Sequence, residues 1–242
     1  ESSFRDVARG PKGRLRIDVP APIGRQILIP RLSEFHARYP DVELHIGMGD
    51  RSVDLVREAV DCVIRVGELQ DSTLVARRIG MLKMITCATP DYLDRYGIPL
   101  SIDDLSQHLA VHYFSSRTGR NFDWDFIVDG QTKQVAMRGS VSVNDSEAYV
   151  TCGLQSFGLI QPARFTVLPH LESGALVEVL PQLSPTPIPM WVAYMQNRHL
   201  SAKVRAFVDW VSELFAACPL LGGVDSRISE YNLNANPAKW MD

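Results

Sequence analysis

The chain has 242 residues, of which 45% are hydrophobic and 22% are charged, with a formal net charge of −3. This balance excludes a disordered chain, and the lack of any continuous apolar run of about 18 residues excludes a membrane-spanning helix and a membrane partner. DNA or RNA binding by this segment itself is not expected either, because such binding needs clustered lysine and arginine to neutralise phosphates.

The cysteines favour a reducing compartment. They are widely scattered, and no two of them have the spacing of a metal site. Two disulfides are a possible alternative, but the apolar neighbours of each cysteine favour buried free thiols and a cytoplasmic location. The first residues contain no apolar run, so no signal peptide is expected, although a mature secreted protein would look the same. The four cysteines are Cys62, Cys87, Cys152 and Cys218.

The first third of the chain predicts strands that alternate with helices. Residues 14–19 and 42–46 alternate polar and apolar side chains, which is typical of strands. Between them a turn at 20–24 leads into a helix over 23–38, and Pro30 is expected to kink it. The apolar face of this helix consists of Leu28, Leu32, Phe35 and Tyr39.

The same pattern then repeats. Asp50 is expected to cap a helix that runs to about Ala59, and residues 62–66 predict a third strand. A strand–helix–strand–helix–strand order implies a parallel sheet, and so an α/β fold. Two further strands are predicted at 74–79 and 84–88.

The second half of the chain predicts a different, mixed arrangement. Thr89 and Pro90 predict a helix start and Gly97 its end, and residues 101–104 have the pattern of a capping box. Glycines at 119, 130 and 139 are expected to turn the chain between strands. The other predicted elements are strands at 109–114, 122–128, 134–143, 157–161, 176–180 and 190–194 and helices at 144–152, 163–170 and 201–218.

These elements group into two lobes. Residues 13–86 with 190–218 form the first predicted lobe, and residues 87–189 form the second. The chain would cross between them twice, near 86–89 and near 186–190. Open sheets of this kind bind ligands at the carboxyl ends of their strands, so a cleft is expected there. Residues 1–12 and 219–242 are predicted to be a residual linker and a loose tail.

Several short motifs follow one another along the chain. They include Pro30-Arg-Leu-Ser-Glu-Phe35, Tyr39-Pro40-Asp41-Val42-Glu-Leu44, Asp61-Cys-Val-Ile-Arg-Val-Gly67, Asp104-Leu-Ser-Gln-His108 and Gly158-Leu-Ile-Gln-Pro162. Each motif is weak alone, but together they span about residues 13–216. In this order they resemble the effector-binding domain of LysR-type transcriptional regulators.

The resemblance implies a fold, a partner and a mechanism. The fold would be the periplasmic-binding-protein type 2 fold, in which two Rossmann-like lobes are joined by two crossover strands. A small-molecule effector would bind between the lobes and change their orientation. Such regulators form homodimers or tetramers, here with residues 23–38 and 42–46 at the dimer seam, and bind DNA only through an N-terminal domain that is absent from this chain.

The candidate effector-binding residues lie in the turns after the predicted parallel strands. Helices that begin in such turns offer backbone N–H groups and a partial positive charge. Pro20 and Pro22 have no N–H, however, which favours a neutral or weakly acidic, partly aromatic effector over a carboxylate. The candidates are Pro20, Ala21, Pro22, Gly49, Asp50, Arg65, Val66, Tyr113, Phe114, Asn144, Asp145, Leu159 and Gln161.

Each of these candidates also has a purely structural interpretation. Asp50 and Asp145 would serve equally well as ordinary helix caps, and Arg65 would pair with Asp50 or Asp61. Core packing is the favoured role for the aromatic residues Tyr113, Phe114 and Trp124. For Asn144 and Gln161, capping and backbone satisfaction are as well supported as ligand binding.

Two other functions remain as alternatives. A secreted solute-binding protein of a transporter shares this fold, and would favour an export signal and a monomer. An enzyme is not expected, because Leu154 replaces the first glycine of an esterase elbow around Ser156. His108 and His112 have the spacing of zinc ligands but lack the glutamate between them. No catalytic residue, metal or cofactor is therefore predicted.

Overall fold

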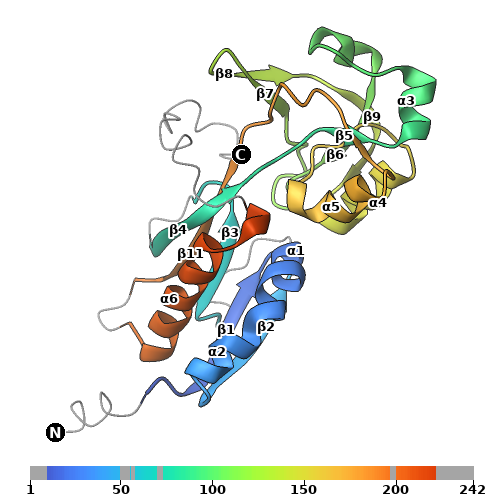
Figure 1. The fold of residues 1–242 in the computed structure, drawn as a ribbon. Helices are drawn as coiled ribbons and strands as arrows, with labels where there is room; N and C mark the ends of the chain where they lie inside the picture. The colour runs from blue at the N-terminus through green and yellow to red at the C-terminus, as the bar shows by residue number, and fades with distance from the viewer. Residues whose placement is uncertain (1–9, 50–54, 56–57, 70–72, 197–199, 222–242) are drawn as a thin grey trace, which may run out of the picture. The chain divides into compact units, whose positions relative to one another are not determined.

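The computed structural model describes residues 10–49, 55, 58–69, 73–196 and 200–221, and Figure 1 shows its elements. The chain divides into two compact units. Of the described residues, unit 1 comprises those up to Gly80 and those from Pro189 onward, and unit 2 comprises those from Met81 to Ile188. None of the helices in the described part of the chain combines the length and the apolar character that crossing a bilayer requires.

Unit 1 is built on a five-stranded sheet whose strand order is β2-β1-β3-β11-β4. Strand β1 is parallel to both β2 and β3, as the sequence predicts, whereas β11 is antiparallel to β3. The strands predicted at 14–19, 42–46, 62–66, 74–79 and 190–194 are therefore confirmed, whereas the strand predicted at 84–88 is reduced to Cys87–Ala88. The strands are β1 (Gly13–Val19), β2 (Val42–Met48), β3 (Cys62–Val66), β4 (Leu74–Leu82) and β11 (Ile188–Met195).

The helical segment between β1 and β2 is irregular, as expected from the presence of Pro30. It consists of α1 (Ala21–Ile23), the π-helical η1 (Gly24–Leu28), the 3-10 helix η2 (Ile29–Arg31) and α2 (Leu32–Arg38). Proline lacks the N–H that an α-helix needs, and its ring displaces the carbonyl one turn earlier. The π and 3-10 turns around Pro30 accommodate both effects.

The closing helix α6 (Ala202–Ala216) supplies much of the core of unit 1. Ser201 caps it, since its hydroxyl accepts a hydrogen bond from the N–H of Val204 at 3.4 Å. The ring of Phe35 on α2 lies 5.9 Å from that of Phe207, so α2 and α6 pack side by side (Figure 1). The apolar residues that recur at helical spacing along α6 are all buried, namely Val204, Phe207, Val208, Val211, Leu214 and Phe215.

Some predictions fall on residues that are not described. The helix predicted from Asp50 to Ala59 lies largely outside the described residues, as do most of the two predicted terminal tails. The short 3-10 helix η4 (Pro219–Leu221) is the last described element.

Unit 2 contains a sheet whose central strands are buried on both faces. The segment Leu159–Ile160 forms bridges to β5 on one side and to β6 on the other, so the order is β10, β5, 159–160, β6 and β9. The neighbours Leu159 and Ile160 belong to different core clusters, because successive side chains of a strand point to opposite faces. The strands are β5 (Cys87–Ala88), β6 (Leu109–Tyr113), β9 (Arg138–Val143) and β10 (Val177–Glu178).

Strand β7 (Trp124–Val128) and strand β8 (Gln131–Val135) form a hairpin. Asp129 and Gly130 both have positive φ, which the two-residue turn requires. The single strand predicted over 134–143 is wrong, because β8 ends at 135 and β9 begins at 138. Gly139 is not a turn residue either. It lies within β9, where a Cβ would stand 2.0 Å from the carbonyl oxygen of Ala110.

The remaining elements of unit 2 are helices. Helix α3 (Pro90–Tyr96) begins and ends as predicted, with Thr89 as its cap and Gly97 at φ 84°. The helix expected after residue 101 is only the 3-10 helix η3 (Asp103–Gln107), whose Asp104 carboxylate accepts the Ser101 N–H. Helices α4 (Ser146–Leu154) and α5 (Arg164–Glu172) follow.

All four cysteines are free thiols, as predicted. Cys62 and Cys87 are fully buried at β3 and β5, and burial raises the pKa of each thiol well above its ordinary value. These thiols therefore act as small apolar core residues at neutral pH.

Candidate effector-binding site

The predicted residues of unit 1 gather at one edge of its sheet. Val19 is paired with Met48 at the carboxyl ends of the parallel strands β1 and β2. Pro20 and Gly49 follow directly, and the Gly49 N–H donates to the Val19 carbonyl at 3.2 Å. Val66, which ends the parallel strand β3, is partly exposed at the same edge. Asp50 lies outside the described residues.

The helix that begins at this edge offers few backbone donors. Pro20 is the N-cap of α1 and makes no side-chain cap hydrogen bond, and Pro22 occupies the first turn. The N–H of Gly24 already donates to the Pro20 carbonyl at 2.9 Å. Ala21 and Ile23 carry the other N–H groups of this turn, and both residues are buried. The electrostatic attraction of this helix start for an anion is therefore weak.

Arg65 forms an ion pair with Asp18, which is not among its predicted partners. The Arg65 guanidinium donates to the Asp18 carboxylate at 3.1 Å and to the Ile64 carbonyl at 3.2 Å. The two charged side chains are only 17% and 13% exposed. The only cation among the predicted site residues thus already has a carboxylate partner.

Of the two carboxylates considered as partners of Arg65, Asp50 lies outside the described residues and Asp61 is bonded elsewhere. Asp61 precedes β3 and Arg65 lies near its end, so the two residues belong to opposite edges of the sheet. The Asp61 carboxylate instead accepts the Arg16 N–H at 2.8 Å and the Lys203 ammonium at 3.2 Å.

The predicted residues of unit 2 also meet at a single edge. Strands β6 and β9 are parallel and end together at Tyr113 and Val143. Leu159 bridges Ala110 in the parallel sense, so the chain leaves this third strand at Gln161. As a result, the carboxyl ends of three parallel strands are followed by Phe114, Asn144 and Gln161.

Hydrogen bonds join the first two of these turns. The Tyr113 hydroxyl donates to the Asn144 carbonyl at 3.1 Å, and the Asn144 amide donates to the Ser116 hydroxyl at 3.1 Å. The ring of Tyr113 also contacts Phe122 and Tyr149, at centroid distances of 6.2 and 5.6 Å. The Tyr113 side chain therefore has a structural role while remaining half exposed at this edge.

Asp145 is the N-cap of α4. Its carboxylate accepts the N–H of Ala148 at 2.8 Å, so part of this helix start is already satisfied. Asn144 does not cap the helix. Two other aromatic or apolar candidates are core residues, since Leu159 is fully buried and Trp124 is 4% exposed.

Gln161 is held by polar groups from three different segments. Its backbone N–H donates to the Tyr149 hydroxyl at 2.9 Å. Its side-chain amide donates to the Thr86 hydroxyl and to the Asp125 carbonyl, each at 3.3 Å. Burial raises the pKa of Tyr149 far above its ordinary value, so this hydroxyl is neutral. Gln161 is thus positioned by both its backbone and its side chain.

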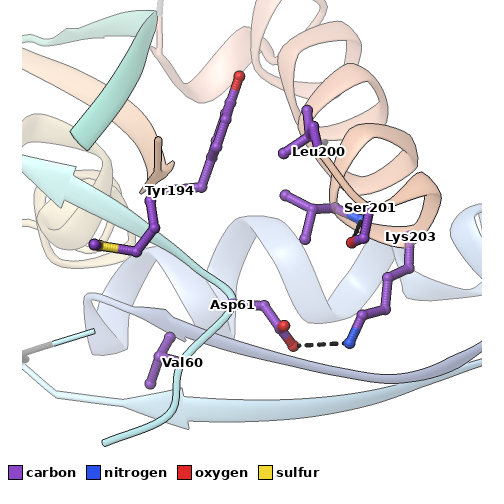
Figure 2. Close-up of a pocket in the computed structure, with 8 residues that line it drawn as sticks. Val60, Asp61, Tyr194, Leu200, Ser201 and Lys203 are labelled. Carbon is purple, nitrogen blue, oxygen red and sulfur yellow. Dashed lines mark hydrogen bonds and ion pairs between the residues drawn. The ribbon is translucent and has the colours of Figure 1, made fainter. Parts of the chain in front are cut away.

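A cavity of about 220 Å³ in unit 1 lies away from the predicted residues (Figure 2). It adjoins Asp61, which directly precedes β3, and so lies at the amino end of that strand. The Asp61–Lys203 ion pair forms part of its wall. Ligands of open α/β sheets bind at the opposite, carboxyl edge. The lining residues are Val60, Asp61, Tyr194, Met195, Leu200, Ser201, Lys203 and Val204.

The residues considered for catalysis have structural partners. The Ser156 hydroxyl lies 2.6 Å from that of Thr89, and His108 Nδ1 lies 3.3 Å from the Tyr92 hydroxyl. Within the described ranges, no three His, Cys, Asp or Glu side chains are grouped as metal ligands.

The sequence profile of the LysR substrate binding domain matches residues 8–216. The transcriptional regulator YhjC of Escherichia coli is 38% identical over 209 residues, which are 86% of this chain and 70% of that protein. A transcriptional repressor of Pseudomonas aeruginosa is 36% identical over 220 residues, which are 90% of this chain and 69% of that protein. These relatives favour a regulator over the solute-binding protein of a transporter.

Solved structures agree with the predicted fold. The Vibrio cholerae virulence activator AphB matches 87% of this chain and 72% of its own, with a TM-score of 0.69 and 28% identity. The LysR-type regulator CrgA from Neisseria meningitidis matches 88% of this chain and 72% of its own, with a TM-score of 0.72 and 24% identity. The periplasmic-binding-protein type 2 fold, in which two lobes are joined by two crossover strands, is confirmed.

Proposed function

This chain belongs to the family of LysR substrate-binding domains, and we propose that it senses a neutral or weakly acidic, partly aromatic small molecule. The family consists of regulator domains and is not a class of enzymes. LysR-type regulators bind small-molecule effectors and form oligomers. The proposal adds where the effector binds in this chain and which chemistry it has.

One observation carries the proposed site. In each unit, turns that follow parallel strands bring predicted effector residues to the carboxyl edge of a sheet. Pro20, Gly49 and Val66 do so in unit 1, and Asn144 and Gln161 do so in unit 2. We propose that the effector binds to both edges and favours one orientation of the two lobes, which are residues 13–86 with 190–218 and residues 87–189. An effector shifts such an equilibrium only if it binds one orientation more tightly.

The proposed preference for a neutral effector rests on charge. Arg65 is paired with Asp18, Pro20 and Pro22 lack N–H groups, and Asp145 occupies a donor of α4. A carboxylate bound at this site would lose its hydration without gaining an unpaired cation. Such uncompensated desolvation costs on the order of several kcal/mol. The half-exposed rings of Tyr113 and Phe114 support a partly aromatic effector.

We further propose a cytoplasmic dimer, or a tetramer in the full regulator. Strand β2 is the outer strand of the unit 1 sheet, and it lies beside α2 in the chain, which supports these segments as the dimer seam. DNA would be bound by a separate helix-turn-helix domain of the kind that the relatives' names describe. Light scattering after size exclusion tests the dimer, since a monomer at micromolar concentration contradicts it.

Calorimetric titration tests the choice of effector. Matched neutral and anionic aromatic molecules, such as benzamide and benzoate, differ mainly in charge. We expect the neutral member of such pairs to bind more tightly. Saturable binding of benzoate, with no competition from benzamide, contradicts the proposed preference.

A further inference from the structure

We propose that Gln161 is a specificity-determining residue that presents only its side-chain carbonyl oxygen to the effector, so that the effector must offer a hydroxyl or N–H donor there. This inference rests on the sensor function proposed above and names a chemical requirement of the same site. It follows from the surroundings of the two ends of the Gln161 amide, since the nitrogen has hydrogen-bond partners within the described residues and the oxygen has none.

The partners of the amide nitrogen fix its orientation. Nε2 lies 3.3 Å from the backbone carbonyl oxygen of Asp125, and a carbonyl can only accept a hydrogen bond. Rotating the amide by 180° would bring Oε1 against that oxygen, so that two acceptors would face each other. The second contact of Nε2, with the Thr86 hydroxyl at 3.3 Å, is compatible with either orientation because a hydroxyl can donate or accept, so the Asp125 carbonyl decides. The orientation with nitrogen inward is therefore strongly preferred.

The two acceptors are themselves fixed. Asp125 is 2% exposed, and its carboxylate accepts the N–H of Thr186 at 3.2 Å. Thr86 is also 2% exposed, and its carbonyl accepts the N–H of Val179 at 2.9 Å. The Asp125 carbonyl is part of the backbone of β7, which pairs with β8, so it cannot turn away without disturbing that pairing. The backbone that carries the Thr86 hydroxyl is likewise fixed by its bond to Val179. Gln161 is consequently held by a rigid support rather than by mobile surface groups.

The carbonyl oxygen of the same amide is left for solvent or a ligand. Within the described part of the chain no donor reaches Oε1, and no side-chain oxygen there is both buried and without a partner. Oε1 must therefore be accessible, in agreement with the half-buried state of Gln161. It is an acceptor at the carboxyl edge of unit 2, where the neighbouring strand β6 is followed by Phe114.

An acceptor in this position discriminates between ligands. A hydroxyl, amine or primary amide can donate to Oε1, whereas a carboxylate or an ether has only lone pairs to offer. Binding of a carboxylate or an ether would remove water from Oε1 without replacing its hydrogen bond. Fixed polar groups of this kind reject analogues that lack the matching group more strongly than apolar walls do.

The orientation can be tested without any ligand. The side-chain NH₂ signal of Gln161 in a ¹H–¹⁵N spectrum is identified by its loss in Gln161→Leu. We expect its protons to exchange with water more slowly than those of Gln155, which is exposed at the end of α4. Equally fast exchange of the two amides would mean that the Gln161 nitrogen is not held, and it would overturn the proposal.

The selectivity is tested with neutral probes that differ by methylation. Benzyl alcohol is compared with benzyl methyl ether, and benzamide with N,N-dimethylbenzamide. We expect the donor-bearing member to bind at least about fivefold more tightly, the equivalent of one ordinary hydrogen bond. The preference should vanish in Gln161→Leu and persist in the control Gln155→Leu, which separates loss of the donor from the bulk of the methyl group.

Two results would overturn the inference, namely equal binding of the methylated probes or an unchanged preference in Gln161→Leu. Failure of the sensor function would look different. In that case, small molecules would perturb neither carboxyl edge, while the exchange of the Gln161 amide would still report how the side chain is held.

Discussion

Removing either charge of the Asp18–Arg65 pair should destabilise unit 1 substantially. The two atoms lie 3.1 Å apart and both side chains are largely buried. Their attraction is about 5 kcal/mol at an effective dielectric constant of about 20, and the cost of desolvating both charges offsets much of it. The net coupling should then be about 2 kcal/mol. Arg65→Met should cost about 3 kcal/mol, because it leaves a carboxylate without its cation in a poorly hydrated place.

A double-mutant cycle measures this coupling. Urea unfolding at pH 7 gives the free energies of unfolding of Asp18→Asn, Arg65→Met and the double variant, which should be more stable than the sum of the two losses predicts. The matched control is the Arg77–Asp209 pair, at 3.3 Å but more than half exposed on both sides. Its coupling should be below about 0.5 kcal/mol. If Arg65→Met changed the stability as little as Arg77→Met does, Arg65 would be free to bind an anionic effector and the charge argument would fail.

Three further predictions concern unit 2. Asp145→Ala should cost about 1 kcal/mol in urea unfolding, because the N–H of Ala148 loses its cap, and no measurable loss would contradict the assigned cap. Gly139→Ala should cost at least about 2 kcal/mol and weaken amide protection in β6, since its Cβ would overlap the Ala110 carbonyl, whereas Gly10→Ala should be almost neutral. Burial lowers the pKa of His108, so the unfolded state binds more protons, and stability should fall as the pH drops below about 6.5. This slope should be shallower in His108→Gln, and an unchanged slope would contradict the role of His108.

Features that depend on neighbouring residues could be predicted from the sequence. The alternation in β1 and β2, the helix start at Thr89 and the apolar face of α6 are signals within one segment. Pro30 likewise perturbs its own helix. The parallel pairing in the first third of the chain could also be predicted, because strand–helix–strand units connect in few ways.

Features that depend on strand register, or on the close approach of distant segments, could not be predicted from the sequence. Asp18 meets Arg65 across 47 residues because of the pairing of β1 with β3. The partners of Gln161 come from 36 and 75 residues away. Gly139 resembles a turn residue in the sequence, yet it is required where β9 approaches β6 closely. Of these residues, only Asp18 could have been singled out from the sequence as a site residue, because it is a carboxylate near the carboxyl end of a predicted strand.

The most direct test of the account is to map a bound molecule by amide chemical shifts. A small molecule that copurifies with the protein, detected by native mass spectrometry, is titrated into ¹⁵N-labelled protein. The account predicts shifts at Gly49 and Val66 in unit 1 and at Asn144 and Gln161 in unit 2, with the molecule recovered at unchanged mass. Shifts confined to the cavity beside Asp61 and Lys203, or recovery of a chemically altered molecule, would contradict it.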